Sequence, residues 1–91
     1  MIAINRAIAI AETRGAEAGL AALDALGTDP RLADYQPYWA ARGALLARAG
    51  KHDDADEAYA RAIGLESDPA LRRFLQQKRA ALSSGGPPPL G

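Results

Sequence analysis

Cysteine is absent from this 91-residue chain, which excludes disulfide bonds and zinc sites built from thiolates. Aromatic residues are scarce, with one Trp, one Phe and three Tyr. No apolar run approaches the roughly 18 residues that a membrane span requires. The 11 basic and 11 acidic residues balance, so no net charge draws the chain to nucleic acid or to an anionic membrane. We therefore expect a cytoplasmic protein that does not contact membranes.

Alanine is abundant: it supplies 22 residues, about half of the apolar total. A chain of this length forms one small domain with a limited core. With so many small side chains, that core should consist of close contacts between helices. It leaves little bulk to enclose a deep pocket.

Apolar spacing and helix-end signals predict an all-α protein of five helices, at about 2–14, 16–26, 36–49, 53–65 and 69–82. Residues 31–34 are expected to complete a loop between the second and third helices. The Gly- and Pro-rich segment 83–91 is expected to be a disordered tail beyond a helical domain of residues 1–82.

The second and fifth expected helices each have a defined apolar face. The second should present a ladder of small residues and a stripe of leucines: Ala18, Ala22 and Ala25, with Leu20, Leu23 and Leu26. The fifth has apolar residues at helical spacing: Leu71, Phe74, Leu75 and Leu82, with Lys78 among them.

Residues 39–63 have the spacing of a tetratricopeptide helix pair: Trp39, Gly43, Leu46, Gly50, Ala55, Tyr59, Ala62 and Ile63. Gly43 should let the following helix approach closely, and the alanines should keep that contact thin. An offset of 35 superimposes a weaker copy, in which Gly15 corresponds to Gly50. The sequence therefore predicts two antiparallel helix pairs and a C-terminal capping helix, an architecture typical of binding modules.

Catalytic and metal-binding chemistry is not predicted. His52 stands beside Asp53 and near Glu57, but a single His with flexible carboxylates matches no recognised metal-ligand spacing. An acidic start to a helix is the simpler interpretation, because it favours the positive end of the helix dipole. The serines and glycines form neither a nucleophilic site nor a phosphate loop. We expect no enzyme activity, cofactor or metal.

The fifth helix is basic, which raises the alternative of a weak nucleic-acid binder. Its cations are Arg72, Arg73, Lys78 and Arg79. Basic residues also keep the outer face of a capping helix soluble, and Phe74 and Leu75 are expected in the core. Without net positive charge, the electrostatic signature of a nucleic-acid binder is missing, so direct DNA contact is not favoured.

A concave surface remains as the candidate binding site, because the first helix of each pair lines that side in such arrays. Its expected residues are small, with a few polar points: Asn5, Ala9, Glu12, Thr13, Ala40, Ala44, Ala47, Arg48, Gln76 and Ala80. The candidate partner contacts among them are Asn5, Glu12, Thr13, Ala44, Arg48 and Gln76. Such a groove suits a helix or an extended segment of a partner protein.

The first helix has apolar residues on two sides. Ile4, Ile8 and Ala11 form one stripe, whereas Ile2 and Ile10 point about 120–160° away from it. Ile2 and Ile10 are therefore further candidate contacts, covered by a preceding helix, a partner or a second copy in a homodimer. The simpler alternative is that these isoleucines are exposed singly.

Five segments carry a resemblance to one family: AINRAIAIAE at 3–12, GLAALDAL at 19–26, DPRLADY at 29–35, AYARAIGL at 58–65 and DPALRRFL at 68–75. Together they resemble the C-terminal tetratricopeptide-like extension of bacterial extracytoplasmic-function RNA polymerase sigma factors. The resemblance covers residues 2 to about 82.

The resemblance implies the tail of a longer protein, either excised from it, with Met1 an internal methionine, or encoded alone. In that family the promoter- and polymerase-binding regions precede this segment. The resemblance also implies regulation of transcription through protein contacts. Its expected partners are RNA polymerase, the upstream sigma-factor regions, or a small regulatory protein of the YCII-related type that is often encoded beside such factors. The alternative is a stand-alone helical-repeat scaffold or self-association domain.

Overall fold

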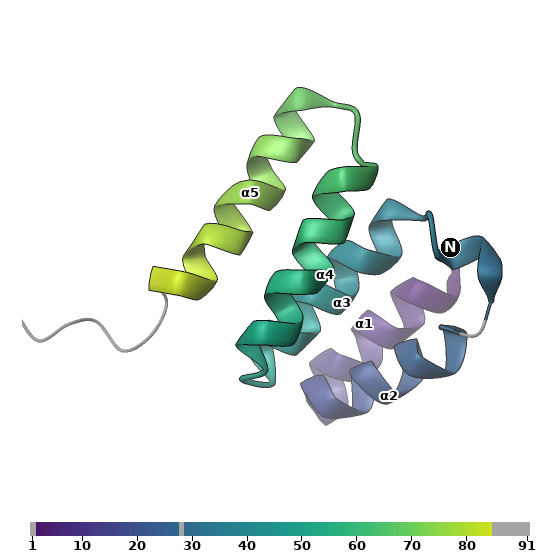
Figure 1. Ribbon diagram of the computed structural model, residues 1–91. Coiled ribbons are helices and arrows are strands. Elements are labelled where there is room, and N and C mark those ends of the chain that lie inside the picture. The colour runs from purple at the N-terminus through teal and green to yellow at the C-terminus, as the bar shows by residue number, and fades with distance from the viewer. Residues whose placement is uncertain (1, 28, 85–91) are drawn as a thin grey trace, which may run out of the picture.

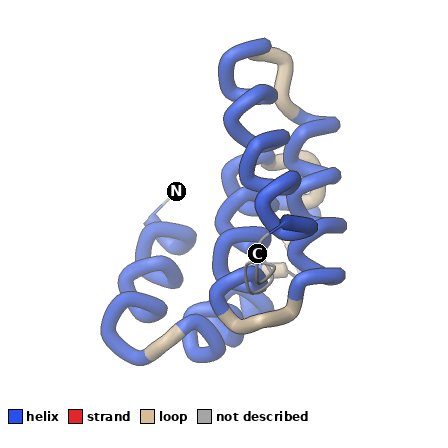
Figure 2. Tube along the Cα trace, turned by 90° about the vertical axis from the view of Figure 1, so that its left-hand side faces the viewer, coloured by secondary structure: helices blue, strands red, loops and turns tan. Residues whose placement is uncertain are grey.

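The computed structural model describes residues 2–27 and 29–84, and helices make up its regular structure. The helices are α1 (Ile2–Arg14), α2 (Ala16–Leu26), α3 (Gln36–Arg48), α4 (His52–Leu65) and α5 (Pro69–Ser84), with a short 3₁₀ helix, η1 (Pro30–Leu32). No strand occurs in the described part of the chain (Figure 2). The predicted all-α class is confirmed.

Helices α3 and α4 depart from their predicted bounds by one residue each, and two larger differences occur. Residues expected to form only a loop contain η1, which begins where the Asp29 carboxylate accepts a hydrogen bond from the Arg31 backbone N–H at 3.0 Å. This is an N-cap, and it supports a helical turn before α3. Helix α5 continues to Ser84, so the first two residues of the predicted tail are helical. The rest of that tail, 85–91, lies outside the described residues.

Two glycines with positive φ connect α1 to α2 and α3 to α4. Gly15 has φ of 101° between α1 and α2, and Gly50 has φ of 82° between α3 and α4. Glycine adopts such backbone angles without the steric penalty that a Cβ imposes. The two residues are those that the 35-residue offset aligned.

Each helix packs on the next one along the chain, and α3 also contacts α1. Figure 1 shows α5 at one end of this arrangement, beside α4 and away from α2. The larger core cluster joins α1–α4 and η1: Ile4, Ala7, Ala11, Leu20, Leu23, Leu32, Tyr38, Ala41, Leu45, Leu46, Ala55 and Ala58. A smaller cluster joins α4 and α5: Tyr59, Ala62, Ile63 and Leu75.

Gly43 allows the close approach of α3 and α4 that the sequence predicts. A Cβ at this position would lie 3.0 Å from the ring carbons of Tyr59, and Ala55 and Ala62 of α4 are fully buried. Little space therefore separates the two helices, and the Tyr59 ring packs flat against the glycine backbone.

The contact of α2 with α1 depends on Gly19, which sequence reasoning missed. A Cβ on Gly19 would lie 2.7 Å from Ala11 Cβ and 2.9 Å from the Ala7 carbonyl oxygen. The predicted alanine ladder is wrong at Ala25, which is exposed. The buried residues of α2 are Gly19, Leu20 and Leu23. The buried side of the helix therefore carries these leucines and not the alanine ladder.

Trp39 fastens the connection between α2 and α3. Its indole Nε1–H donates to the Ala33 carbonyl oxygen at 2.9 Å, and Arg61 Nη2 of α4 donates to the same oxygen at 3.3 Å. The Arg61 guanidinium lies 4.9 Å from the centre of the indole ring, within the range of a cation–π interaction. Trp39 is half-buried and packs against both core clusters.

Replacing Trp39 with Phe should lower the free energy of unfolding by about 1–2 kcal/mol, since the indole hydrogen bond is lost and the ring becomes smaller. Urea unfolding followed by far-UV circular dichroism measures this change without needing the Trp. Arg61→Leu keeps the indole bond and removes the cation, so its loss should stay below about 1 kcal/mol. A Trp39→Phe protein as stable as the parent would show that the indole bond contributes nothing.

Candidate interaction surface

Glu12 and Arg48 bring α1 and α3 together on an exposed side of the molecule. Glu12 Oε1 and Arg48 Nη1 lie 3.3 Å apart, although the residues are 36 positions apart in the chain. Both side chains remain largely exposed to solvent. The structure thus places two of the predicted groove residues side by side, one on α1 and one on α3.

The other predicted residues of α1 and α3 are less concentrated. Asn5 is exposed on α1, and Ala44 of α3 is half-buried. The Thr13 hydroxyl donates to carbonyl oxygens of its own helix, at 3.2 Å to Ala9 and 3.3 Å to Ile10. Thr13 is therefore engaged locally, and Glu12 with Arg48 forms the polar centre of this face.

Gln76 and Ala80 lie in a different place from the one expected. They line an open hollow between α4 and α5, together with Asp56, Ile63 and Arg79. No residue of α3 is among the described residues that line this hollow. Gln76, on α5, therefore lies next to α4. The expected groove is not continuous from Arg48 to α5.

The apolar side of α1 also differs from the prediction. The buried residues are Ile4, Ala7 and Ala11, whereas Ile8, expected in the same stripe, is 37% exposed. Ile8 lies about 100° from Ala7 round the helix, at the edge of the covered arc. Ile10, expected to point away, is half-buried. The side chain of Ile2 lies outside the described residues.

The apolar face of α5 is only partly covered. Leu75 is buried and Leu82 half-buried, but Leu71 is 47% and Phe74 52% exposed. The expectation that Phe74 is in the core is therefore wrong. α5 packs mainly on α4, and a single neighbouring helix covers a narrow arc of its surface.

Two of the four cations of α5 bind other parts of the protein. Arg79 makes a forked contact with Asp56 of α4, with Nε 2.8 Å from Oδ1 and Nη2 3.2 Å from Oδ2. The hydrogen bonds from Arg79 lower the pKa of the Asp56 carboxyl below its usual value. Arg72 Nη1 donates to the Glu66 carbonyl oxygen at 3.4 Å. The ion pair with Asp56 offsets the positive charge of Arg79 that a nucleic acid would otherwise meet.

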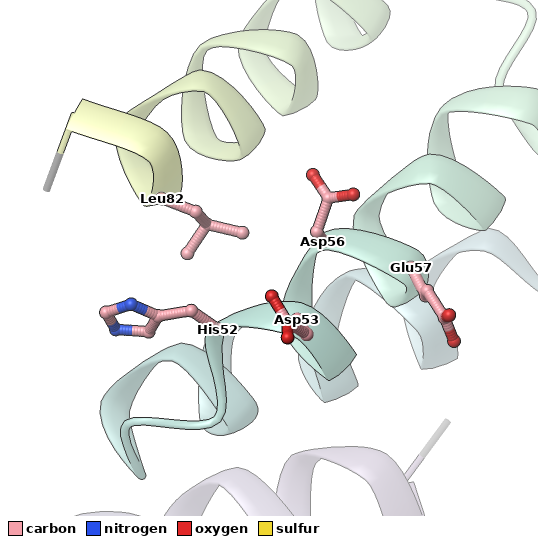
Figure 3. Close-up of a pocket in the computed structure, with 5 residues that line it drawn as sticks. All are labelled: His52, Asp53, Asp56, Glu57 and Leu82. Carbon is pink, nitrogen blue, oxygen red and sulfur yellow. The ribbon is translucent and has the colours of Figure 1, made fainter.

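The acidic start of α4 forms no enclosed site. His52, Asp53, Asp56 and Glu57 line an open hollow with Leu82, and their side chains point in different directions (Figure 3). Within the described residues, no three His, Asp or Glu side chains gather closely enough to hold a metal ion. Among the described helices, none is both long and apolar enough to cross a membrane.

Comparison with known proteins gives one informative similarity. The chain is 33% identical over 78 residues to a protein of Rhizobium meliloti (strain 1021) that is described only as uncharacterized. The aligned region covers 86% of this chain but 18% of that protein, so the chain spans less than a fifth of its relative's length. No protein-family model and no solved structure matches the chain.

Proposed function

We propose that this chain is a non-enzymatic protein-interaction module of two tetratricopeptide-like helix pairs and a capping helix. The observation that carries the proposal is the exposed contact of Glu12 with Arg48, which joins the first helix of one pair to the first helix of the next. The matching positive-φ glycines, Gly15 and Gly50, support a repeated unit. A partner helix or extended segment would lie across α1 and α3 and use this polar centre for recognition.

We further propose that the module is the regulatory C-terminal region of an extracytoplasmic-function sigma factor in the cytoplasm. The family resemblance of residues 2–82 supports this role, and the similarity to a small part of a much longer protein is consistent with it. The partner would then be RNA polymerase, the upstream sigma-factor regions or a small regulatory protein. No cofactor is required.

Arg48→Glu should weaken partner binding at least tenfold, because it sets two carboxylates against each other at the centre of the face and repels a partner selected for Arg48. Binding to core RNA polymerase and to separately expressed sigma-factor regions can be measured by biolayer interferometry. Arg73→Glu makes the same change of charge on an exposed part of α5 and should change affinity less than about threefold.

The results separate the two parts of this proposal. If Arg48→Glu binds like the parent chain, the α1–α3 face is not the binding surface. If the parent chain binds neither polymerase nor sigma-factor regions, the sigma-factor role is wrong. Gln76→Ala tests the contribution of α5, and an unchanged affinity there would restrict the site to α1 and α3.

Self-association is a second candidate function, favoured by the exposed side chain of Ile8 on α1. Light scattering over a concentration series tests it. A mass that rises with concentration in the parent and stays monomeric in Ile8→Ser would support a dimer through α1. A monomeric parent at high concentration would exclude this function.

A further inference from the structure

Leu71, Phe74 and Lys78 form a continuous exposed strip on α5, which we call the α5 strip. Their spacing of three and then four residues places them on one face, over about 10 Å of helix. The strip starts about 40° round the helix from buried Leu75 and extends to Phe74, about 100° from it. It therefore lies beside the contact with α4 and faces solvent.

The α5 strip combines apolar surface with positive charge. Lys78 Nζ lies 5.4 Å from the centre of the Phe74 ring, so the cation sits over an exposed aromatic face. Within the described residues, Lys78 forms no ion pair with a carboxylate. The sequence of α5 contains four Arg and Lys residues and no Asp or Glu, so no acidic side chain of this helix offsets the charge.

Where a second copy of this chain exposes large apolar side chains, its charge does not complement the α5 strip. The other exposed large apolar residue among those described is Ile8 of α1, and α1 carries two arginines with one glutamate. Pairing α5 with α5, or α5 with α1, would bring positively charged helices together. A partner with carboxylates beside its apolar residues removes this repulsion.

We propose that the α5 strip docks an acidic amphipathic helix of a partner protein. Apolar side chains of that helix, three or four residues apart, would cover Leu71 and Phe74, and a flanking carboxylate would bind Lys78. This surface is separate from the Glu12–Arg48 face, so it adds a second binding site to the proposed function.

Two synthetic helical peptides test the proposal with the full chain. Both carry the same leucine stripe, one flanked by Glu and the other by Lys, and fluorescence anisotropy measures their binding. The acidic peptide should bind at least tenfold more tightly than the basic one. Phe74→Ala should weaken it at least tenfold, because a large contact in the middle of the interface is lost.

Charge variants identify the surface. Lys78→Glu should weaken the acidic peptide by about tenfold and strengthen the basic one. Arg73→Glu makes the same change of charge about 140° round α5 from Lys78 and should alter binding less than about threefold. Arg48→Glu should leave peptide binding unchanged, so failure here and failure of the Glu12–Arg48 face can be told apart. Circular dichroism verifies that each variant is folded.

Three results would overturn the proposal. Equal affinity for both peptides would show that charge does not select the partner. Equal losses in Lys78→Glu and Arg73→Glu would indicate general attraction of an acidic peptide to a basic helix. A parent chain that dimerises in light scattering, and becomes monomeric in Phe74→Ala, would assign the strip to a second copy.

Discussion

Gly19→Ala is expected to lower the free energy of unfolding by about 2 kcal/mol. The new Cβ would lie 2.7 Å from Ala11 Cβ, 2.9 Å from the Ala7 carbonyl oxygen and 3.1 Å from Leu45 Cδ1. Two of these neighbours belong to α1, so the helices must move apart, at a cost of about 3 kcal/mol. The greater helix propensity of alanine offsets about 1 kcal/mol of that cost.

Gly64→Ala is the matched control for this prediction. Gly64 also lies within a helix, but it is exposed, and a Cβ there would meet no atom within 4 Å. The substitution should raise the free energy of unfolding by about 0.5–1 kcal/mol through helix propensity alone. Urea unfolding of both variants gives the comparison. If both substitutions stabilise the protein equally, the contact between α1 and α2 is looser than the structure shows.

Leu45→Ala should cost about 3–4 kcal/mol, because it removes most of a fully buried side chain. Leu45 is 2% exposed and is one of the two largest fully buried side chains. Its Cδ1 approaches Gly19, so the side chain fills the place where α3 meets α2. Removing it leaves a cavity that the surrounding helices can close only in part.

Leu71→Ala removes the same atoms from a side chain that is 47% exposed, so its cost should stay below about 1 kcal/mol. Thermal and urea unfolding of the two variants measure the difference. A Leu71→Ala loss as large as that of Leu45→Ala would place Leu71 inside the core and would contradict an exposed α5 strip. A small loss for both would contradict the core assigned to Leu45.

Local signals account for the part of the fold that could be predicted. Glycine and proline mark the helix ends, which is why the five helices begin and end within a few residues of their predicted positions. Gly43 was predicted to let the following helix approach closely because it lacks a side chain, and the structure places the Tyr59 ring against it. These signals depend on residues that are near one another in the chain.

How much of each helix surface is covered by neighbouring helices could not be predicted in the same way. Periodicity assigns Phe74 to an apolar face, but only the position of α4 decides that Phe74 stays exposed while Leu75 is buried. Gly19 did give a signal. A glycine in the middle of an alanine-rich helix destabilises that helix by about 1 kcal/mol relative to alanine. Its presence there therefore indicates a close approach of another helix.

In the candidate site, too, some residues were predicted correctly and others depend on how the helices pack. Glu12 and Arg48 were both predicted for the concave face, and they meet because α1 and α3 pack as neighbours. Gln76 was assigned to that face by analogy with the first helix of each pair, but α5 places it beside Ile63 of α4. Contacts between distant positions, such as Asp24 with Arg42, depend on helix orientation and have no sequence signal.

Helix α5 contributes little buried surface to its contact with the rest of the molecule. Leu75 is its buried side chain among those described, Leu82 is half-buried, and Arg79 adds a solvent-exposed ion pair. Exposed ion pairs contribute at most about 1 kcal/mol, so separating α5 from α4 costs much less than unfolding the larger cluster. Helix α5 is therefore the part of the described fold that local opening can detach at the smallest cost in free energy.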